Sequence, residues 1–298
     1  MAPYLGNGME AQDTAPQSLK VPLRPGYEHR QQWKDIGHTL KRLGSYSSQA
    51  EEKSYDLVCV GFGPASLAIA VAMNDAVEGD GLDDKPKACF LERQKQFGWH
   101  AGMLLPGTKM QISFIKDFAS LRDPRSEFTF LNYLKRHNRL VEFTNLGTFL
   151  PSRTEFEDYM GWCASHFVDQ VEYGTEVLEI SAAPSSDRIE RFSVKCRNVN
   201  TNTTFSRKAS NIVIAVGGTP HIPENLWLDD PRVNHSSQYA KKIDSIISDK
   251  DKQYTIAVVG SGQSGAEIFH DIQNRYPNAK TRLIIRDTAL RPSDDSPL

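Results

Sequence analysis

The chain has 298 residues, 39% hydrophobic and 24% charged, which is typical of a globular protein large enough for one or two domains. Its formal net charge of −2 gives no general attraction to nucleic acid or to an anionic membrane, and we expect neither as a partner. Residues 1–20 lack the features of a signal peptide, and Gly61, Gly63 and Pro64 interrupt the longest weakly polar run. We therefore expect a cytoplasmic protein.

Residues 1–52 are polar and rich in Gln, Ser, Gly and Pro. We predict a mostly disordered tail with a short helix near residues 31–43. The first structured unit follows. A strand over residues 55–60 meets a glycine turn, a helix covers 67–76, and a second strand over 88–91 ends at Glu92.

The middle of the chain begins with a loop-rich stretch over residues 97–124. The patterns that follow predict further helices and strands. Helices are expected near residues 129–139 and 153–169, strands near 171–180, 192–197 and 212–216, a loop over 181–187 and a hairpin turn over 198–204.

A second copy of the first unit ends the chain. A strand over residues 254–259 meets a turn at Gly260, a helix covers 266–276, and a strand over 281–285 ends at Arg286. Two strand–turn–helix–strand units predict an α/β fold with two parallel sheets and two Rossmann-like domains.

The two glycine turns have the spacing of a dinucleotide-binding loop. In such a loop the first glycine makes the turn, the second lets the backbone approach a pyrophosphate, and the third lets helix and strand pack closely. The helix N-terminus then offers N–H groups and a positive dipole end to the phosphates. The positions are Gly61, Gly63 and Ser66 in the first copy and Gly260, Gly262 and Gly265 in the second.

The charged residue after each second strand indicates the nucleotide. A carboxylate there accepts hydrogen bonds from a ribose, whereas an arginine accommodates a 2′-phosphate. Glu92 therefore favours FAD or NAD, and the polar insert at residues 74–86 accounts for its long distance from the glycines. Arg286 favours NADP, with a solvated surface arginine as the alternative.

Two different nucleotide sites on one chain suggest a hydride donor that feeds a flavin. This class includes disulfide reductases and flavin monooxygenases. The four cysteines, which form no CxxC pair, are Cys59, Cys89, Cys163 and Cys196. Their spacing favours buried free thiols over disulfides or a zinc site, so we expect oxygen chemistry and no metal.

Several long motifs resemble the L-ornithine N5-monooxygenases of fungal siderophore biosynthesis, within the lysine/ornithine N-monooxygenase family. The resemblance runs over residues 55–298. The motifs are Gly61-Phe-Gly-Pro-Ala-Ser-Leu-Ala, Phe97-Gly-Trp-His-Ala-Gly-Met103, Lys109-Met-Gln-Ile-Ser-Phe, Lys116-Asp, Leu121-Arg-Asp-Pro-Arg, Phe128-Thr-Phe-Leu-Asn-Tyr-Leu, Ile214-Ala-Val-Gly-Gly-Thr-Pro and Gly260-Ser-Gly-Gln-Ser-Gly-Ala-Glu.

The resemblance implies a function and a set of site residues. NADPH would reduce FAD, O2 would give a C4a-hydroperoxyflavin, and the side-chain amine of L-ornithine would be hydroxylated, the first step of hydroxamate siderophore synthesis. A homotetramer is implied as well. The implied residues are Gly61, Gly63, Ser66, Glu92, Arg93, Trp99, His100, Met110, Gln111 and Val177 for FAD, Lys116 for the ornithine carboxylate, and Ser261, Gly262, Gln263, Ser264 and Arg286 for NADPH, with Gln263 also catalytic beside the reacting flavin position.

The resemblance also predicts the domain organisation. We expect a tail over residues 1–52, an FAD domain over 53–222 and an NADPH domain over 223–298. Because family chains continue further, we expect the NADPH domain to be incomplete and hydroxylation by the 298-residue chain to be weak or absent.

Alternatives remain at this stage. The same glycine motifs fit an NADPH oxidase that releases peroxide, or an inactive nucleotide-binding module. Lys116 could be an ordinary surface lysine, and Trp99 and His100 could fill a loop core. A hydrolase nucleophile elbow at Ser264 is disfavoured, because Ala266 stands where that motif requires glycine.

Overall fold

The computed structural model describes residues 53–79, 81–82, 84–182, 189–286 and 288–290, which all fall within one unit, Ser47–Leu298. The predicted tail over residues 1–52, its helix and most of the loop predicted over 181–187 lie outside the described residues. The boundary that we place between residues 222 and 223 stays a prediction.

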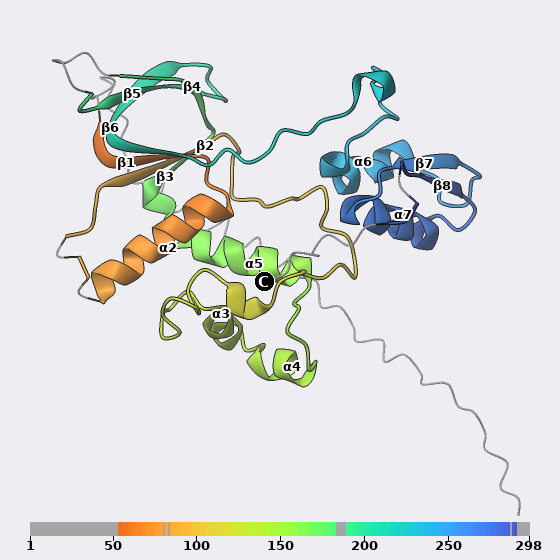
Figure 1. Cartoon of the computed structure of the whole chain (residues 1–298), viewed down its shortest axis with the longest axis horizontal. Helices are drawn as coiled ribbons and strands as arrows, with labels where there is room; N and C mark the ends of the chain where they lie inside the picture. Colours follow the sequence, from red (N-terminus) through yellow and green to blue (C-terminus); the bar gives the residue numbers. More distant parts are fainter. Residues whose placement is uncertain (1–52, 80, 83, 183–188, 287, 291–298) are drawn as a thin grey trace, which may run out of the picture. The chain divides into compact units, whose positions relative to one another are not determined.

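The first predicted strand–turn–helix–strand unit is present. Strand β1 (Ser54–Val60) leads into helix α2 (Pro64–Glu78), and strand β2 (Ala88–Glu92) then pairs with β1 in parallel (Figure 1). All five residues of β2 are buried, as expected for a strand covered on both faces. Pro64 opens α2, a position where its fixed φ suits the helix and its missing N–H costs nothing.

The sheet around β1 is mixed, which corrects the prediction of a parallel sheet. Its order is β3-β2-β1-β6-β5-β4. Strand β6 (Thr204–Ile214) pairs in parallel with β1 through its second half, and antiparallel with β5 (Phe192–Asn198) through its first half. The first half of β6 was not predicted. One long strand thus joins a parallel layer to an antiparallel layer.

The strand predicted over residues 171–180 is two strands. Strand β3 (Val171–Tyr173) pairs in parallel with β2, and β4 (Thr175–Ala182) pairs antiparallel with β5. Gly174 separates them with φ of +68°, a conformation that other residues adopt at a cost. The break lets the chain leave the parallel layer and enter the antiparallel one.

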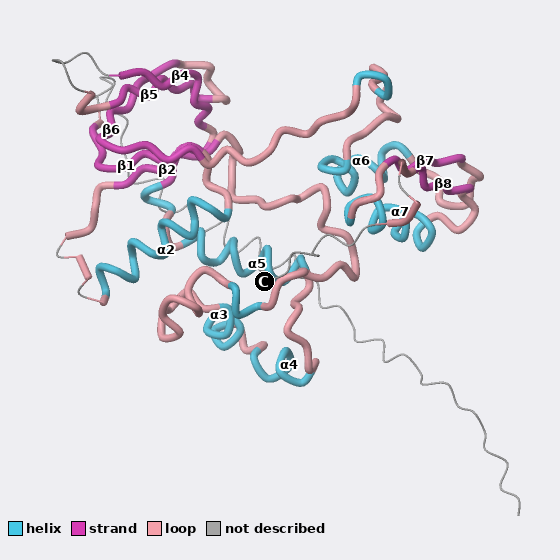
Figure 2. Tube along the Cα trace, viewed as in Figure 1, coloured by secondary structure: helices cyan, strands magenta, loops and turns pink. Residues whose placement is uncertain are grey.

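A hydrophobic core lies between these two layers. Figure 2 shows β4 and β5 above β1 and β2, and buried side chains of both layers form one cluster. Its buried members are Val58, Cys89, Leu91, Val194, Cys196 and Ala209. All four cysteines of the chain are free and buried, as the sequence predicted.

Helix α2 belongs to a layer of helices that covers one face of the parallel strands. Helix α5 (Arg153–Ser165) packs against α2 and also contacts α3 (Phe130–Arg136), which contacts α4 (Leu140–Asn145). Ser152 caps α5 by accepting a hydrogen bond from the Glu155 N–H, and Thr129 caps α3 in the same way. A short 3-10 helix, η2 (Phe114–Lys116), packs the Phe114 ring against Phe130 of α3, with ring centroids 5.8 Å apart. Helix α4 was not predicted.

The second predicted unit is also present. Strand β7 (Thr255–Val259), helix α7 (Gln263–Arg275) and strand β8 (Lys280–Ile284) follow one another, and the two strands pair in parallel. Before them lie two 3-10 helices, η4 (Glu224–Leu226) and η5 (Ser236–Gln238), and helix α6 (Tyr239–Ile246). Helix α6 was not predicted, although Tyr239, Ile243 and Ile247 repeat at helical spacing.

The loop after β2 contributes to the core of this second unit. Met103 and Leu105 are buried in one cluster with residues of α6 and α7. The chain approaches so closely there that a Cβ on Gly102 would overlap the backbone carbonyl of Ser237, and the Ala240 N–H donates to the Gly102 carbonyl. Gly102 is therefore required by packing.

None of the described helices combines the length and apolar character needed to cross a bilayer. Within the same residues, no group of three or more His, Cys, Asp or Glu side chains is arranged to hold a metal ion.

Candidate functional site

The turn between β1 and α2 has the backbone geometry of a phosphate-binding loop. Gly61 has φ of +93°, and a Cβ there would lie 2.5 Å from the Ala215 carbonyl oxygen. Gly63 faces open space, because a Cβ there would meet no atom within 4 Å. Gly63 is also the N-cap of α2, which has no side-chain cap, whereas α3 and α5 have one. The N–H groups at this helix start are thus available to an anion.

Glu92 is fixed beside this turn. The residue is 8% exposed, its Oε2 accepts from the Phe62 N–H at 2.8 Å, and its Oε1 accepts from the Gln94 N–H at 2.7 Å. Two backbone donors compensate for burying the carboxylate. Because each oxygen has a second lone pair, the group can still accept from a ribose hydroxyl. The fold thus brings Glu92 to the first glycine turn, as predicted.

Ser66 lies one turn into α2 and is fully buried. Its Oγ has no hydrogen-bond partner among the described residues. The nearby Cys59 thiol, whose pKa is raised to about 11 by burial, interacts with this hydroxyl only weakly. Because Ser66 has no exposed surface, it serves here as the small residue that the third position of the motif requires. The open space at Gly63, with the buried carboxylate of Glu92 beside the turn, fits FAD.

The turn between β7 and α7 repeats the arrangement. Gly260 has φ of +131°, and a Cβ on Gly265 would lie 2.6 Å from the Gly260 carbonyl oxygen. This is the close approach that the third glycine of the motif allows. Gly262 faces open space, and as N-cap of α7 it leaves the helix without a side-chain cap. The residues present fit a second dinucleotide.

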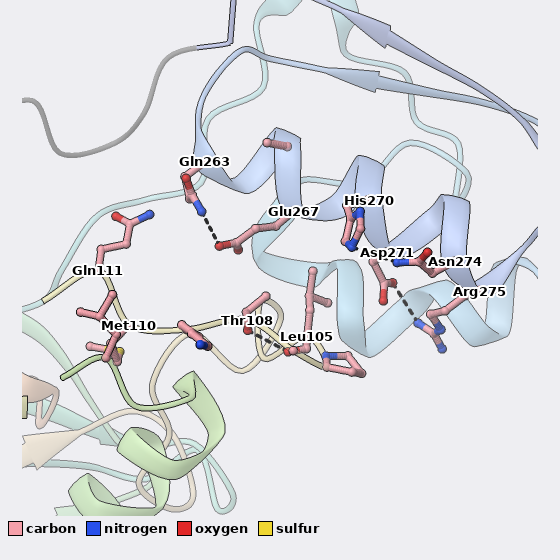
Figure 3. A pocket seen from close by; sticks show the side chains of 15 residues that line it. Leu105, Thr108, Met110, Gln111, Gln263, Glu267, His270, Asp271, Asn274 and Arg275 are labelled. Atoms are coloured by element: carbon pink, nitrogen blue, oxygen red, sulfur yellow. Dashed lines mark hydrogen bonds and ion pairs between the residues drawn. The ribbon is translucent and has the colours of Figure 1, made fainter. Parts of the chain in front are cut away.

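A pocket of about 770 Å³ lies between residues 105–111 and helix α7 (Figure 3). Figure 3 shows Gln263, the first residue of α7, at the same end of the pocket as Gln111 and Met110. Met110 and Gln111, which we assigned to FAD, and Gln263, which we assigned to NADPH, thus line one pocket, although about 150 residues separate them in the sequence.

Two residues that the sequence did not single out connect the pocket walls. Gln263 Nε2 donates to Glu267 Oε1 at 2.8 Å, and Arg153 donates from its guanidinium to Glu267 Oε2 at 2.7 Å. The side chains of Arg153 and Glu267 are 17% and 11% exposed. The four-residue spacing of Gln263 and Glu267 on a predicted helix could have indicated the first contact. No pattern in the sequence near Arg153 indicated the second contact.

Several predicted residues lie outside this pocket lining. Trp99 and His100 contact each other edge to face, with ring centroids 5.1 Å apart, and His100 adopts φ of +44°. Val177 lies on β4 opposite Cys196. Lys116 is exposed at the end of η2. The remaining predicted residues are Arg93 and Arg286, exposed just after β2 and β8, and Ser261 and Ser264 at the second turn.

Two glycine turns, each joining a parallel strand to a helix without a side-chain cap, define an α/β protein with two dinucleotide-binding folds. The family model for L-lysine 6-monooxygenase/L-ornithine 5-monooxygenase matches residues 53–298. The chain belongs to this family, as the sequence motifs indicated.

Similar proteins include an L-ornithine N(5)-monooxygenase of Aspergillus oryzae, 57% identical over 83% of this chain and 51% of the relative. The solved ornithine hydroxylase PvdA of Pseudomonas aeruginosa has a TM-score of 0.73 and 41% identity, over 82% of this chain and 57% of that one. An ornithine N-hydroxylase of Kutzneria sp. 744, solved with reduced FAD, NADP+ and L-ornithine, has a TM-score of 0.73 and 34% identity, over 82% and 56%. The chain thus spans about half the length of the relatives it matches.

Proposed function

We propose that the protein takes part in FAD- and NADPH-dependent hydroxylation of the side-chain amine of L-ornithine, a step towards hydroxamate siderophores. The observation that carries the proposal is the first glycine turn, where Glu92 accepts from the Phe62 N–H beside the open space at Gly63. The chemistry that FAD supplies when bound is acceptance of a hydride from NADPH, followed by activation of O2.

The residues of the chain would divide this work. The turn at Gly61 and Gly63 would hold the FAD pyrophosphate, with Glu92 on the ribose, and the turn at Gly260 and Gly262 would hold that of NADPH. Arg286, exposed after β8, would pair with the 2′-phosphate. Met110, Gln111 and Gln263 would exclude water from the reacting groups and orient them.

Further assignments rest on family membership. Trp99, His100 and Val177 would complete the flavin surroundings, and the exposed cation of Lys116 would bind the ornithine carboxylate. The relatives named above act on ornithine, which supports ornithine as the substrate class. The cytoplasmic location, the homotetramer and a domain boundary near residue 222 belong to the same proposal.

A pair of glycine variants tests the FAD site. In Gly63→Ala the added methyl group enters space that is open in the protein, so the fold should persist. We expect FAD affinity to fall at least about tenfold, because the backbone no longer approaches the pyrophosphate. Flavin absorbance after reconstitution measures this. Gly161→Ala on α5, where a Cβ also meets nothing within 4 Å, is the matched control. Equal FAD affinity in the unsubstituted chain, Gly63→Ala and Gly161→Ala would contradict the proposed FAD site.

Reduction and product formation test the reaction. NADPH should reduce the bound flavin faster than NADH under anaerobic conditions. Arg286→Ala should weaken NADP+ binding roughly tenfold or more, because a charge-assisted hydrogen bond is lost, and should leave NAD+ binding unchanged. Equal rates with both nucleotides would remove the role of Arg286. In air with ornithine, the 298-residue chain should form little N5-hydroxyornithine, in line with the weak hydroxylation expected of it. Any such product supports the proposal, and hydrogen peroxide with no hydroxylated product indicates an oxidase instead.

A further inference from the structure

The amide of Gln263 is held by a short chain of polar contacts that begins at the pocket wall and ends at Arg153 behind it. Its Nε2 donates to Glu267 Oε1, and Glu267 Oε2 accepts from Arg153 (Figure 3 shows the first contact). The carboxylate and the guanidinium are both largely removed from solvent. In such surroundings a charge-assisted hydrogen bond is worth more than one at an exposed surface.

The chemistry of Glu267 determines which way the amide points. A carboxylate paired with an arginine accepts hydrogen bonds and donates none. Gln263 must therefore turn its NH2 group toward Glu267 and its carbonyl oxygen away. Because Gln263 also lines the pocket, that oxygen becomes an acceptor available to a ligand.

Arg153 connects this contact to the opposite wall. Its own N–H donates to the Thr108 carbonyl at 3.0 Å, and the Met110 N–H donates to the Pro151 carbonyl at 2.8 Å. The start of α5 is thus bound to residues 108–110 through its backbone and to α7 through the Arg153 side chain. The backbone of residues 151–153 and the Arg153 side chain together link the two pocket walls.

We propose that Glu267, anchored by Arg153, is a positioning residue that orients the Gln263 amide so that its carbonyl oxygen faces a hydrogen-bond donor of the bound nucleotide. The orientation is a property of this chain alone. The ligand half rests on the function proposed above, and the two halves are tested separately.

The orientation is tested without any ligand. In the ¹H–¹⁵N spectrum of the perdeuterated 298-residue chain, the Gln263 side-chain amide is assigned by its loss in Gln263→Ala. We expect this signal to move and its exchange with water to quicken at least about tenfold in Glu267→Gln and Glu267→Ala, because the charged acceptor is lost. Glu127→Gln, which neutralises the partly exposed partner of Arg136, is the control and should leave the Gln263 signal unchanged. An unchanged Gln263 signal in both Glu267 variants would overturn the proposal.

The ligand half is tested by calorimetric titration with NADP+ in a double-mutant cycle. We expect Gln263→Ala and Glu267→Gln each to weaken binding roughly tenfold, and the double variant to bind about as weakly as Gln263→Ala, because Glu267 acts through Gln263. A roughly hundredfold, additive loss would mean that Glu267 acts on its own and would overturn this half. If the unmodified chain binds no NADP+, the proposed function fails, while the amide spectra still decide the orientation.

Discussion

At the scale of single residues, some positions of this chain can be predicted from the local sequence and others cannot. Glu92 and Arg286 end predicted strands, so their positions at the carboxyl ends of those strands can be expected from sequence pattern alone, and Glu92 is held beside the first turn by the Phe62 N–H. Arg153 and Glu267 are 114 positions apart, and nothing local to either predicts their ion pair. Contacts of this kind depend on how helices pack.

The cysteines give a prediction at the residue scale. Burial raises the pKa of Cys59 to about 11 and those of Cys89 and Cys196 to about 12, and it also raises the pKa of Cys163. A thiol with a pKa near 11 is ionised to roughly one part in a thousand at pH 8. We expect no thiol of the native chain to react with a disulfide reagent within minutes at pH 8, and all four to react in urea.

The pH dependence of this reaction has a definite sign. Since the folded-state pKa values are raised, the thiolate fraction of the folded chain should climb about tenfold per pH unit from pH 8 toward pH 11. Because the thiols are also buried, labelling requires local opening of the structure as well. Rapid native labelling of one thiol at pH 8 would show that burial is not maintained at that cysteine.

At the scale of secondary-structure elements, the residue that begins each helix is informative. Helices α3 and α5 begin with Thr129 and Ser152, whose side chains cap them, and α4 and α6 begin with Arg139 and Gln238 without a side-chain cap. Among the described α-helices, only α2 and α7 begin with glycine. The glycine spacing made α2 and α7 predictable. The antiparallel half of β6 pairs with β5 across a short hairpin and was missed because its residues are largely polar. The break at Gly174 was missed because it depends on a pairing with β2, which lies far away in the sequence.

The second turn gives a prediction at this scale. Gly265→Ala should lower stability by about 1–3 kcal/mol, because its Cβ would lie 2.6 Å from the Gly260 carbonyl oxygen and α7 would have to shift. Gly262→Ala should leave the unfolding midpoint nearly unchanged but weaken NADP+ binding, since its Cβ enters open space. Urea unfolding and NADP+ titration measure the two effects. Equal stability loss in both variants would contradict the close approach.

At the scale of the whole described molecule, the loop after β2 serves two regions. Residues Trp99 and His100 lie in the segment assigned to FAD, and Met103 and Leu105 enter the core around α6 and α7 a few residues later. Gly102 makes that connection possible by its approach to Ser237. The sequence indicated this segment only as a family motif in a loop, because loop composition does not specify a packing partner.

The packing of this loop against Ser237 can be tested by alanine substitutions at two of its glycines. Gly102→Ala should destabilise the chain by roughly 2 kcal/mol or more, since its Cβ would overlap the backbone of Ser237. Gly98→Ala is the control, because its Cβ would make only an ordinary contact with the Gln94 side chain, at 3.6 Å. Thermal unfolding of both variants provides the measurement. If Gly102→Ala and Gly98→Ala unfold at the same temperature, the loop does not pack as described.

The sequence by itself determined the two strand–turn–helix units, the glycines at their turns and the charged residues after their second strands. These features are local: hydrophobic period, backbone freedom at glycine and the residue that ends a strand all act within a few positions. Only the tertiary structure decided the mixed sheet, the pocket between residues 105–111 and α7, and the chain of contacts from Arg153 through Glu267 to Gln263. These arise where distant segments must bury apolar surface together and satisfy the polar groups buried with it.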